Sequence, residues 1–317
     1  FQEDMGGDNR NSSKKPILIV GLCCMDIVNF VDKYPEEDSD TRVFEQTTCL
    51  GGNAANSITV LHQLEANCEL FASLPKNNSI LKTLIHNAGF NIERCLERED
   101  CEVPVSTVIA NRTNGTRTIL HYRGSMPELS CEEFIAAYAD RINQYGWIHF
   151  EGRNFDEVAK MMTYVLSHRK NEYPKISVEL EKVRPYPYFE QLVPQPNVVF
   201  MSKDFARAQG WNSMSEAVLS FQSKYISANL AIICPWGDQG VAGRESPSSS
   251  LIIQQAFTPE IVMDTLGAGD CFLGACLYYL NGEHNLQTVL EKASQIAGKK
   301  CGMKGLTNLD LHSFVAH

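Results

Sequence analysis

Asp264-Thr265-Leu266-Gly267-Ala268-Gly269-Asp270 connects an extended apolar run to an apolar segment with helical spacing. Residues 261–263 before it are expected to be extended, and residues 271–280 after it are expected to form a helix. The two glycines and the alanine would then present unobstructed backbone N–H groups at a helix N-terminus. Such a site attracts anions, phosphate among them.

Asp270 closes this loop, and the sequence allows two interpretations of it. An aspartate at the start of a helix commonly caps the first turn. A carboxylate beside a bound phosphate would repel it unless the carboxylate takes part in chemistry, such as accepting a proton from an attacking hydroxyl. Other parts of the chain are needed to decide between the two.

The size and charge of the chain limit the kinds of binding partner that we expect. The chain has 317 residues, a net charge of -10 and a pI near 5.3. Because no basic block offsets this acidity, we expect neither a nucleic acid nor a membrane surface as partner. The longest apolar run, residues 271–280, is far shorter than the ~20 residues that cross a bilayer. A small molecule is the expected partner.

The number and placement of the cysteines indicate the redox state of the compartment in which the protein is found. There are eleven, an odd number, without any Cys-x-x-Cys pair, and several lie within apolar runs where a free thiol packs as a small hydrophobe. This usage is typical of a reducing compartment, so a cytoplasmic location is expected. Histidines and cysteines show no zinc-ligand spacing, and no residue is assigned as a metal ligand.

The expected organisation is one α/β domain over residues 16–312, preceded by a disordered polar tail over residues 1–15. The apolar run at residues 17–25 suits a central strand with Asp26 at its carboxyl end, where ligands bind in open α/β sheets. Residues 32–50 and 101–124 are expected to leave the sheet as lid insertions. Within the first insertion, residues 42–45 alternate as a half-exposed strand would.

A second glycine loop, Gly51-Gly52-Asn53-Ala54-Ala55-Asn56, precedes another helical segment. Asn114-Gly115 predicts a tight hairpin between residues 103–110 and 116–122, and the two insertions could pair as one small sheet. From residue 147 onward, strand and helix patterns alternate. This predicts a doubly wound, mostly parallel sheet with helices on both faces and a small β lid.

The two glycine loops, in this order, resemble the signature regions of the ribokinase-like (PfkB) carbohydrate kinases, and the resemblance covers nearly the whole chain. Further stretches are similar to the fructose-phosphorylating branch of that family: residues 20–26, 32–39, 51–53, 106–122, 147–154, 202–204 and 297–302. The resemblance implies ATP-dependent transfer of a phosphoryl group to the 1-hydroxyl of fructose. Mg²⁺ would be held mainly through the ATP phosphates, and K⁺ is a further candidate ion.

The resemblance also implies roles for individual residues. Asp270 matches the general base, and the amides of Gly267, Ala268 and Gly269 would form an anion hole. The positions that match sugar contacts are Asp26, Gly52, Asn53, Asn56 and Asp270, with Asp38 reaching the sugar site of a partner subunit in a homodimer clasped through the lid. The positions that match ATP contacts are Arg117, Gly237, Asp238, Gln239 and Gly240, together with the loop at residues 267–269.

Each assignment has a structural alternative. Asn53 and Asn56 would suit helix capping as well as sugar binding. Arg117 on a hairpin and Asp38 in an acidic turn would also suit solvated surface charges. Glu151 and Arg153 could line the sugar pocket or pair with each other.

Two stretches depart from the family pattern. Many members carry an Asn-x-x-Glu motif that helps to organise magnesium, whereas this chain has Ser202-Lys203-Asp204-Phe205. Residues 121–124, His-Tyr-Arg-Gly, place a cation where a carboxylate is usual at the end of the lid. The nature of the sugar is therefore less constrained by the sequence than the kinase activity.

Two other functions stay open at this point. One is a kinase for another small acceptor, such as ribose or a nucleoside. A nucleoside kinase would be expected to offer an apolar base pocket, whereas the lid carries the polar residues Thr107, Asn111, Arg112 and Thr113. The other is a sugar-binding relative without turnover, against which the intact Asp270 counts.

Overall fold

A computed structural model describes residues 15–181, 190–193, 195–225 and 230–315 of the chain. Its central feature is an eight-stranded sheet within these residues. The strands lie in the spatial order β14 (Ile252–Gln254), β13 (Val241–Arg244), β12 (Ala231–Pro235), β11 (Val198–Met201), β10 (Lys175–Leu180), β9 (Trp147–Glu151), β1 (Ile17–Val20) and β4 (Cys68–Phe71). The expected tail at residues 1–15 lies, except for Lys15, outside the described residues.

Pairing in this sheet is parallel from β4 through β12, which confirms the doubly wound α/β prediction. The remaining two strands run antiparallel, β13 against β12 and β14 against β13. Parallel strands bring all their carboxyl ends to one edge of the sheet, where ligands of open α/β folds bind. The short strands β13 and β14 were not expected from the sequence.

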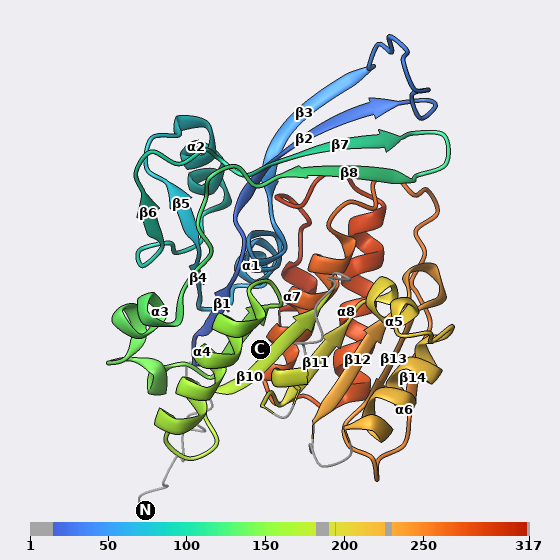
Figure 1. Ribbon diagram of the computed structural model, residues 1–317. Coiled ribbons are helices and arrows are strands. Elements are labelled where there is room, and N and C mark those ends of the chain that lie inside the picture. Colours follow the sequence, from blue (N-terminus) through green and yellow to red (C-terminus); the bar gives the residue numbers. More distant parts are fainter. Residues whose placement is uncertain (1–14, 182–189, 194, 226–229, 316–317) are drawn as a thin grey trace, which may run out of the picture.

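Helices cover both faces of the sheet (Figure 1). One hydrophobic core joins one face to α1 (Asn53–Gln63), α2 (Ser79–Ala88), α7 (Ala268–Asn281) and α8 (Leu286–Cys301). A second core joins the other face to α3 (Cys131–Tyr138), α4 (Phe155–His168), α5 (Lys203–Ala208) and α6 (Met214–Lys224). Alternate residues of β1 enter the two cores, Ile17 and Ile19 the first and Leu18 and Val20 the second. Burial on both faces explains its uninterrupted apolar sequence.

Local sequence signals set several helix ends. The Asn78 side chain accepts a hydrogen bond from the backbone N–H of Leu81 and caps α2, which ends at Gly89 in the left-handed conformation. Ser130 and Glu133 form a reciprocal capping box at the start of α3. No helix in the described parts of the chain combines the length and apolar character that crossing a bilayer requires.

A second sheet forms the lid. Its strands lie in the order β3 (Glu45–Gly51), β2 (Cys24–Val31), β7 (Val105–Asn111) and β8 (Arg117–Tyr122). Strands of both insertions thus belong to one small sheet, but they do not pair with each other, because β2, which precedes the first insertion, lies between them. β7 and β8 form the expected hairpin around Asn114-Gly115. Figure 1 shows these strands as a separate layer at the top of the view, above the body of the protein.

The prediction of one strand over residues 17–25 was wrong. The chain leaves the main sheet after Val20, turns through Gly21, and starts the lid strand β2 at Cys24. Asp26 therefore lies within a lid strand rather than at the end of a central strand. The apolar run continues because β2 is itself partly buried against the body, with Cys24, Asp26 and Val28 among its buried residues.

Two smaller expectations were also wrong. Residues 261–263 form no strand and are exposed, and of residues 42–45 only Glu45 belongs to a strand. The run at residues 70–74 divides between β4 of the main sheet and β5 (Ser73–Pro75), which pairs with β6 (Leu96–Arg98) in a third, two-stranded sheet. Short apolar runs do not reveal which sheet a strand joins.

Candidate active site

The N-termini of α1 and α7 meet beside the carboxyl edge of the main sheet. The two helices pack closely at Gly274, where an added Cβ would lie 2.6 Å from the Ser57 carbonyl oxygen. Ser57 also donates a 3.2 Å side-chain hydrogen bond to the Asp270 carbonyl. Because both helices begin at a glycine loop, their unsatisfied backbone N–H groups and positive dipole ends are brought to one place.

Two glycines shape the first loop. Gly52 has a φ of 95°, and a Cβ there would lie 2.4 Å from the Leu22 carbonyl oxygen. At Gly51 a Cβ would collide with the Asp26 carboxylate, at 2.1 Å from Oδ1. The glycines thus allow the lid strand to bring Asp26, a nearly buried carboxylate, directly against the start of α1.

Asp270 lies in the first turn of α7, and its carboxylate is held from the other helix. The Asn56 side-chain amide donates a 2.7 Å hydrogen bond to Asp270 Oδ2. The pKa of Asp270 is raised to about 8, mainly by burial; the Asn56 hydrogen bond opposes the rise, and the carboxylates of Glu181, Glu151 and Asp26 add to it. A carboxyl group with this pKa exchanges protons near neutral pH, which a merely capping aspartate would not do.

A second carboxylic acid lies near Asp270, and the sequence did not reveal it. Glu179 on β10 accepts a 3.2 Å hydrogen bond from the Asn53 side-chain amide. Burial raises the pKa of Glu179 well above its usual range, with Glu181 and Asp270 as further causes. Asn53 and Asn56 thus contact carboxyl groups rather than cap α1, where no side-chain capping bond is formed. In the sequence, Glu179 is marked only as a carboxylate within a strand-like segment, residues 176–180.

The Gly267 loop is supported from below by a buried ion pair. Lys300 of α8, whose side chain is fully buried, donates to the Asp264 carboxylate at 2.7 Å and to its carbonyl oxygen at 2.8 Å. The same carboxylate accepts from the backbone N–H groups of Leu266 and Gly305. Gly267 begins α7 with a φ of 74°. The buried Lys300–Asp264 pair therefore helps to fix the conformation of the loop.

Lid residues reach this loop. Arg117 Nη1 donates to the Thr265 hydroxyl at 3.1 Å, and that hydroxyl lies 3.2 Å from the Gly115 carbonyl oxygen, which accepts from it. At the opposite edge of the lid sheet, Lys304 pairs with Glu45 of β3 at 2.7 Å. The hairpin tip thus lies against the segment that precedes Gly267, and Arg117 lies near the anion-attracting N-terminus.

The other predicted positions lie farther along the surface. Gly237, Asp238 and Gln239 form an exposed turn after β12, at the same edge of the sheet, and Gly240 closes it with a φ of 98°. A Cβ at Gly240 would lie 2.1 Å from the Gln254 carbonyl oxygen, which accounts for glycine there. Asp38 is exposed on the lid, with a φ of 58°.

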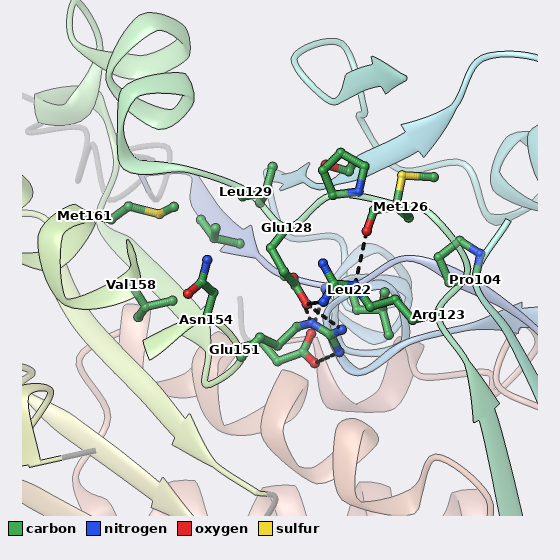
Figure 2. Close-up of a pocket in the computed structure, with 15 residues that line it drawn as sticks. Leu22, Pro104, Arg123, Met126, Glu128, Leu129, Glu151, Asn154, Val158 and Met161 are labelled. Carbon is green, nitrogen blue, oxygen red and sulfur yellow. Dashed lines mark hydrogen bonds and ion pairs between the residues drawn. The ribbon is translucent and has the colours of Figure 1, made fainter. Parts of the chain in front are cut away.

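A chain of charges lines a cavity at the carboxyl ends of β1 and β9. Arg153 pairs with Glu151 at 3.3 Å and with Glu128 at 3.0 Å, and Glu128 lies 3.5 Å from Arg123. Glu151 also accepts a 2.7 Å hydrogen bond from the Leu22 N–H. Figure 2 shows these side chains around a cavity, whose volume is about 40 Å³. Glu151 and Arg153 thus pair with each other, and both also line this cavity.

The family follows from comparison with known proteins. The model of the pfkB family carbohydrate kinases matches residues 14–312. This chain belongs to the pfkB family of carbohydrate kinases. Among curated proteins, the kinase is 36% identical over 302 residues to mouse (Mus musculus) ketohexokinase, covering 93% of this chain and 99% of the relative.

Solved structures agree on the fold of the kinase. Arabidopsis thaliana ribokinase, complexed with ribose and ATP, superposes with a TM-score of 0.78 at 15% identity and covers 96% of this chain and 99% of its own. Sinorhizobium meliloti adenosine kinase also gives 0.78, at 16% identity, covering 95% of this chain and 99% of its own. The ribokinase-like fold is thereby established, and with the family match the chain is an ATP-dependent sugar kinase.

Proposed function

We propose that this kinase is a ketohexokinase, which transfers the γ-phosphoryl group of ATP to the 1-hydroxyl of fructose. The observation that carries the proposal is the similarity to mouse ketohexokinase over nearly the full length of both chains. The cleft supports it, because Asp26, Asn53 and Asn56 offer both hydrogen-bond donors and acceptors to a polyhydroxylated ligand.

Asp270 is proposed as the general base. Its carboxylate would accept the proton of the attacking hydroxyl, and the pKa near 8 suits proton transfer close to neutral pH. Asn56 orients the carboxylate and favours its charged form. In a loose phosphoryl-transfer transition state the hydroxyl proton leaves late, so the placement of the base matters at least as much as its strength.

The amides of Gly267, Ala268 and Gly269 are proposed to bind the transferring phosphoryl group at the N-terminus of α7. Arg117 would contact the ATP phosphates from the lid, because its guanidinium already lies at Thr265, two residues before Gly267. The turn of Gly237, Asp238, Gln239 and Gly240 would bind the nucleotide farther along the same sheet edge.

Magnesium bound to ATP would supply charge neutralisation on the phosphates. Within the described residues, no group of three or more His, Cys, Asp or Glu side chains is arranged to hold a metal ion, and we assign magnesium no protein ligand.

Potassium stays a prediction from the family resemblance. It is tested by comparing turnover in potassium and sodium salts.

We further propose a cytoplasmic homodimer that associates through the lid. Several large apolar side chains are exposed on the lid strands and their connection, among them Phe44 at 62% and Leu120 and Tyr122 at 56% each. Apolar surface of this kind is typical of protein contacts. In such a dimer Asp38 would reach the partner's sugar site. The mass in solution, with and without Phe44→Ser, tests the dimer.

Magnesium-dependent ADP release with fructose, ribose, adenosine and glucose in parallel tests the substrate, with Asp270→Asn as the blank. The proposal expects strong release with fructose that disappears in the variant. Release that follows ribose or adenosine would instead place the chain among the kinases for other small acceptors. Sugar binding without any release would make it a non-catalytic relative.

A further inference from the structure

One cross-strand row of the lid carries polar side chains from four strands. In the register of this sheet, Cys49 of β3 opposes Asp26 of β2, Asp26 opposes Ser106 of β7, and Ser106 opposes His121 of β8. Directly opposed residues point to the same face of a sheet. His121 therefore shares one face of the lid with Asp26, the carboxylate that lies at the start of α1.

This face looks toward the cleft. Arg117 and His121 are four residues apart on β8, so they point to the same side, and Arg117 contacts Thr265 of the body from that side. The charge of Asp26 contributes to raising the pKa of Asp270. Asp264 and Lys300 affect the pKa of Cys49, which burial and nearby Asp26 raise to about 12. Cys49 and Asp26 of this row thus lie near charged groups of the proposed active site.

Polar contacts run along the row. The Ser106 hydroxyl lies 3.2 Å from His121 Nδ1 and 3.9 Å from Cys24 Sγ, and the Cys24 thiol donates to Asp26 Oδ1 at 3.6 Å. Ser106 and Asp26 are nearly buried, whereas His121 is exposed. The contact with Ser106 orients the imidazole, and the imidazole itself is exposed on the face that it shares with Asp26.

Position along the lid distinguishes the two ends of the cleft. Arg117 lies at the hairpin tip, beside the segment that leads to Gly267. Four residues of extended strand span roughly 13 Å, so His121 lies well away from the phosphoryl end. Beyond it, Arg123 follows the end of β8 and pairs with Glu128 beside the cavity at the carboxyl ends of β1 and β9. His121 thus lies level with Asp26, on the side of the site away from the Gly267 loop.

We propose that His121 is a further substrate-contacting residue, which binds a hydroxyl of the acceptor sugar from the lid and contributes to sugar selectivity. Strands two apart in a sheet are separated by roughly 10 Å, so one monosaccharide can touch both Asp26 and the imidazole. Imidazole can donate or accept a hydrogen bond to a hydroxyl. The inference rests on the proposed function, since it assumes a sugar acceptor in this cleft.

The test compares His121→Ala, His121→Gln and the control Thr118→Ala, which alters the opposite face of the same strand. Steady-state constants are measured for fructose, for a series of monodeoxy fructose analogues and for ATP. Loss of one hydrogen bond predicts about a tenfold fall in kcat/KM for fructose in His121→Ala. We expect partial recovery in His121→Gln, an unchanged KM for ATP, and constants for Thr118→Ala close to those of the unmodified kinase.

The analogue series separates a direct contact from a structural role. If His121 binds one hydroxyl, the analogue that lacks it loses little in His121→Ala compared with the unmodified kinase, because the interaction is already absent. An equal loss with every analogue, or a matching rise in the KM for ATP, would overturn the proposal, as would an unchanged kcat/KM for fructose. Failure of the unmodified kinase to phosphorylate any sugar would refute the proposed function instead.

Discussion

The Asn56 side-chain amide donates a 2.7 Å hydrogen bond to the Asp270 carboxylate, across 214 positions of sequence. The bond joins the N-termini of α1 and α7, and with them the two glycine loops. It also ties the proposed base to a residue proposed to bind the sugar. Its removal is therefore expected to change the ionisation of the base as well as its position.

The first prediction concerns pH. Because Asp270 must be ionised to accept a proton and its pKa is about 8, kcat/KM for the sugar should rise with pH and level off above about 8. The Asn56 hydrogen bond lowers this pKa, so Asn56→Leu should move the rising limb to higher pH as well as reduce activity. Initial rates between pH 6 and 9.5 measure both. A flat profile over this range would contradict the assignment.

The second prediction concerns stability. A carboxyl pKa raised from 3.8 to about 8 means that the folded state binds the proton more tightly than the unfolded state. Stability is then lost progressively as pH rises from about 4 through 8. Asp270→Asn removes the titrating group and with it this loss of stability. The variant should therefore have a free energy of unfolding about 1–2 kcal/mol higher at pH 8 to 9, although its turnover is abolished.

Thermal unfolding of the two proteins across pH 5 to 9 measures this effect. The difference in melting temperature should be small at pH 5 and grow toward pH 9, and the exposed Asp140→Asn serves as the control. A destabilised Asp270→Asn at pH 9 would show instead that the folded protein holds the charged carboxylate favourably, which is incompatible with a raised pKa.

The third prediction separates backbone strain from collision at two glycines. Gly52 and Gly210 both have positive φ, 95° and 87°, but a Cβ at Gly52 would meet the Leu22 carbonyl oxygen while one at Gly210 would meet no atom within 4 Å. Gly210→Ala should cost about 1 kcal/mol, and Gly52→Ala a further ~2 kcal/mol together with most of the activity. Chemical denaturation and turnover measure these effects. Equal losses of unfolding free energy in the two variants would mean that the Leu22 carbonyl moves aside without a measurable cost.

The fourth prediction concerns the support of the Gly267 loop. Lys300→Met leaves the largely buried Asp264 carboxylate without its cation, which should cost about 3–5 kcal/mol. The neighbouring Lys299 pairs with Asp310 on the surface, so Lys299→Met should cost less than about 1 kcal/mol. Urea denaturation of the two variants tests the difference. Similar losses for both would show that the buried pair does not stabilise the loop.

Local signals in the sequence predicted much of the fold. The glycine loops, the Asn114-Gly115 hairpin and the strand-helix alternation after residue 147 each depend on neighbouring residues, and each is present. The break between β1 and β2 was missed, because Gly21 is the only interruption in an apolar run that is buried in both strands. β13 and β14 were missed because they have only four and three residues.

The site was predictable where a residue lies in a loop motif and not where it acts through a long-range contact. In the sequence, Lys300 stands in the last turn of a helix, where lysines are usually solvated. Only the structure shows that it is buried against Asp264. Glu179 occupies a strand position, and its proximity to Asn53 depends on how α1 meets β10. Such pairings are set by tertiary structure, which periodicity does not encode.

The position of the phosphate in the product tests the proposed reaction most directly. The kinase is incubated with fructose, ATP and magnesium, and the purified sugar phosphate is examined by carbon and phosphorus NMR for coupling between the phosphorus and the sugar carbons. We predict coupling to carbon 1 and its complete absence from the Asp270→Asn reaction. Coupling to carbon 6, or product from Asp270→Asn at the rate of the unmodified kinase, would contradict the proposed reaction.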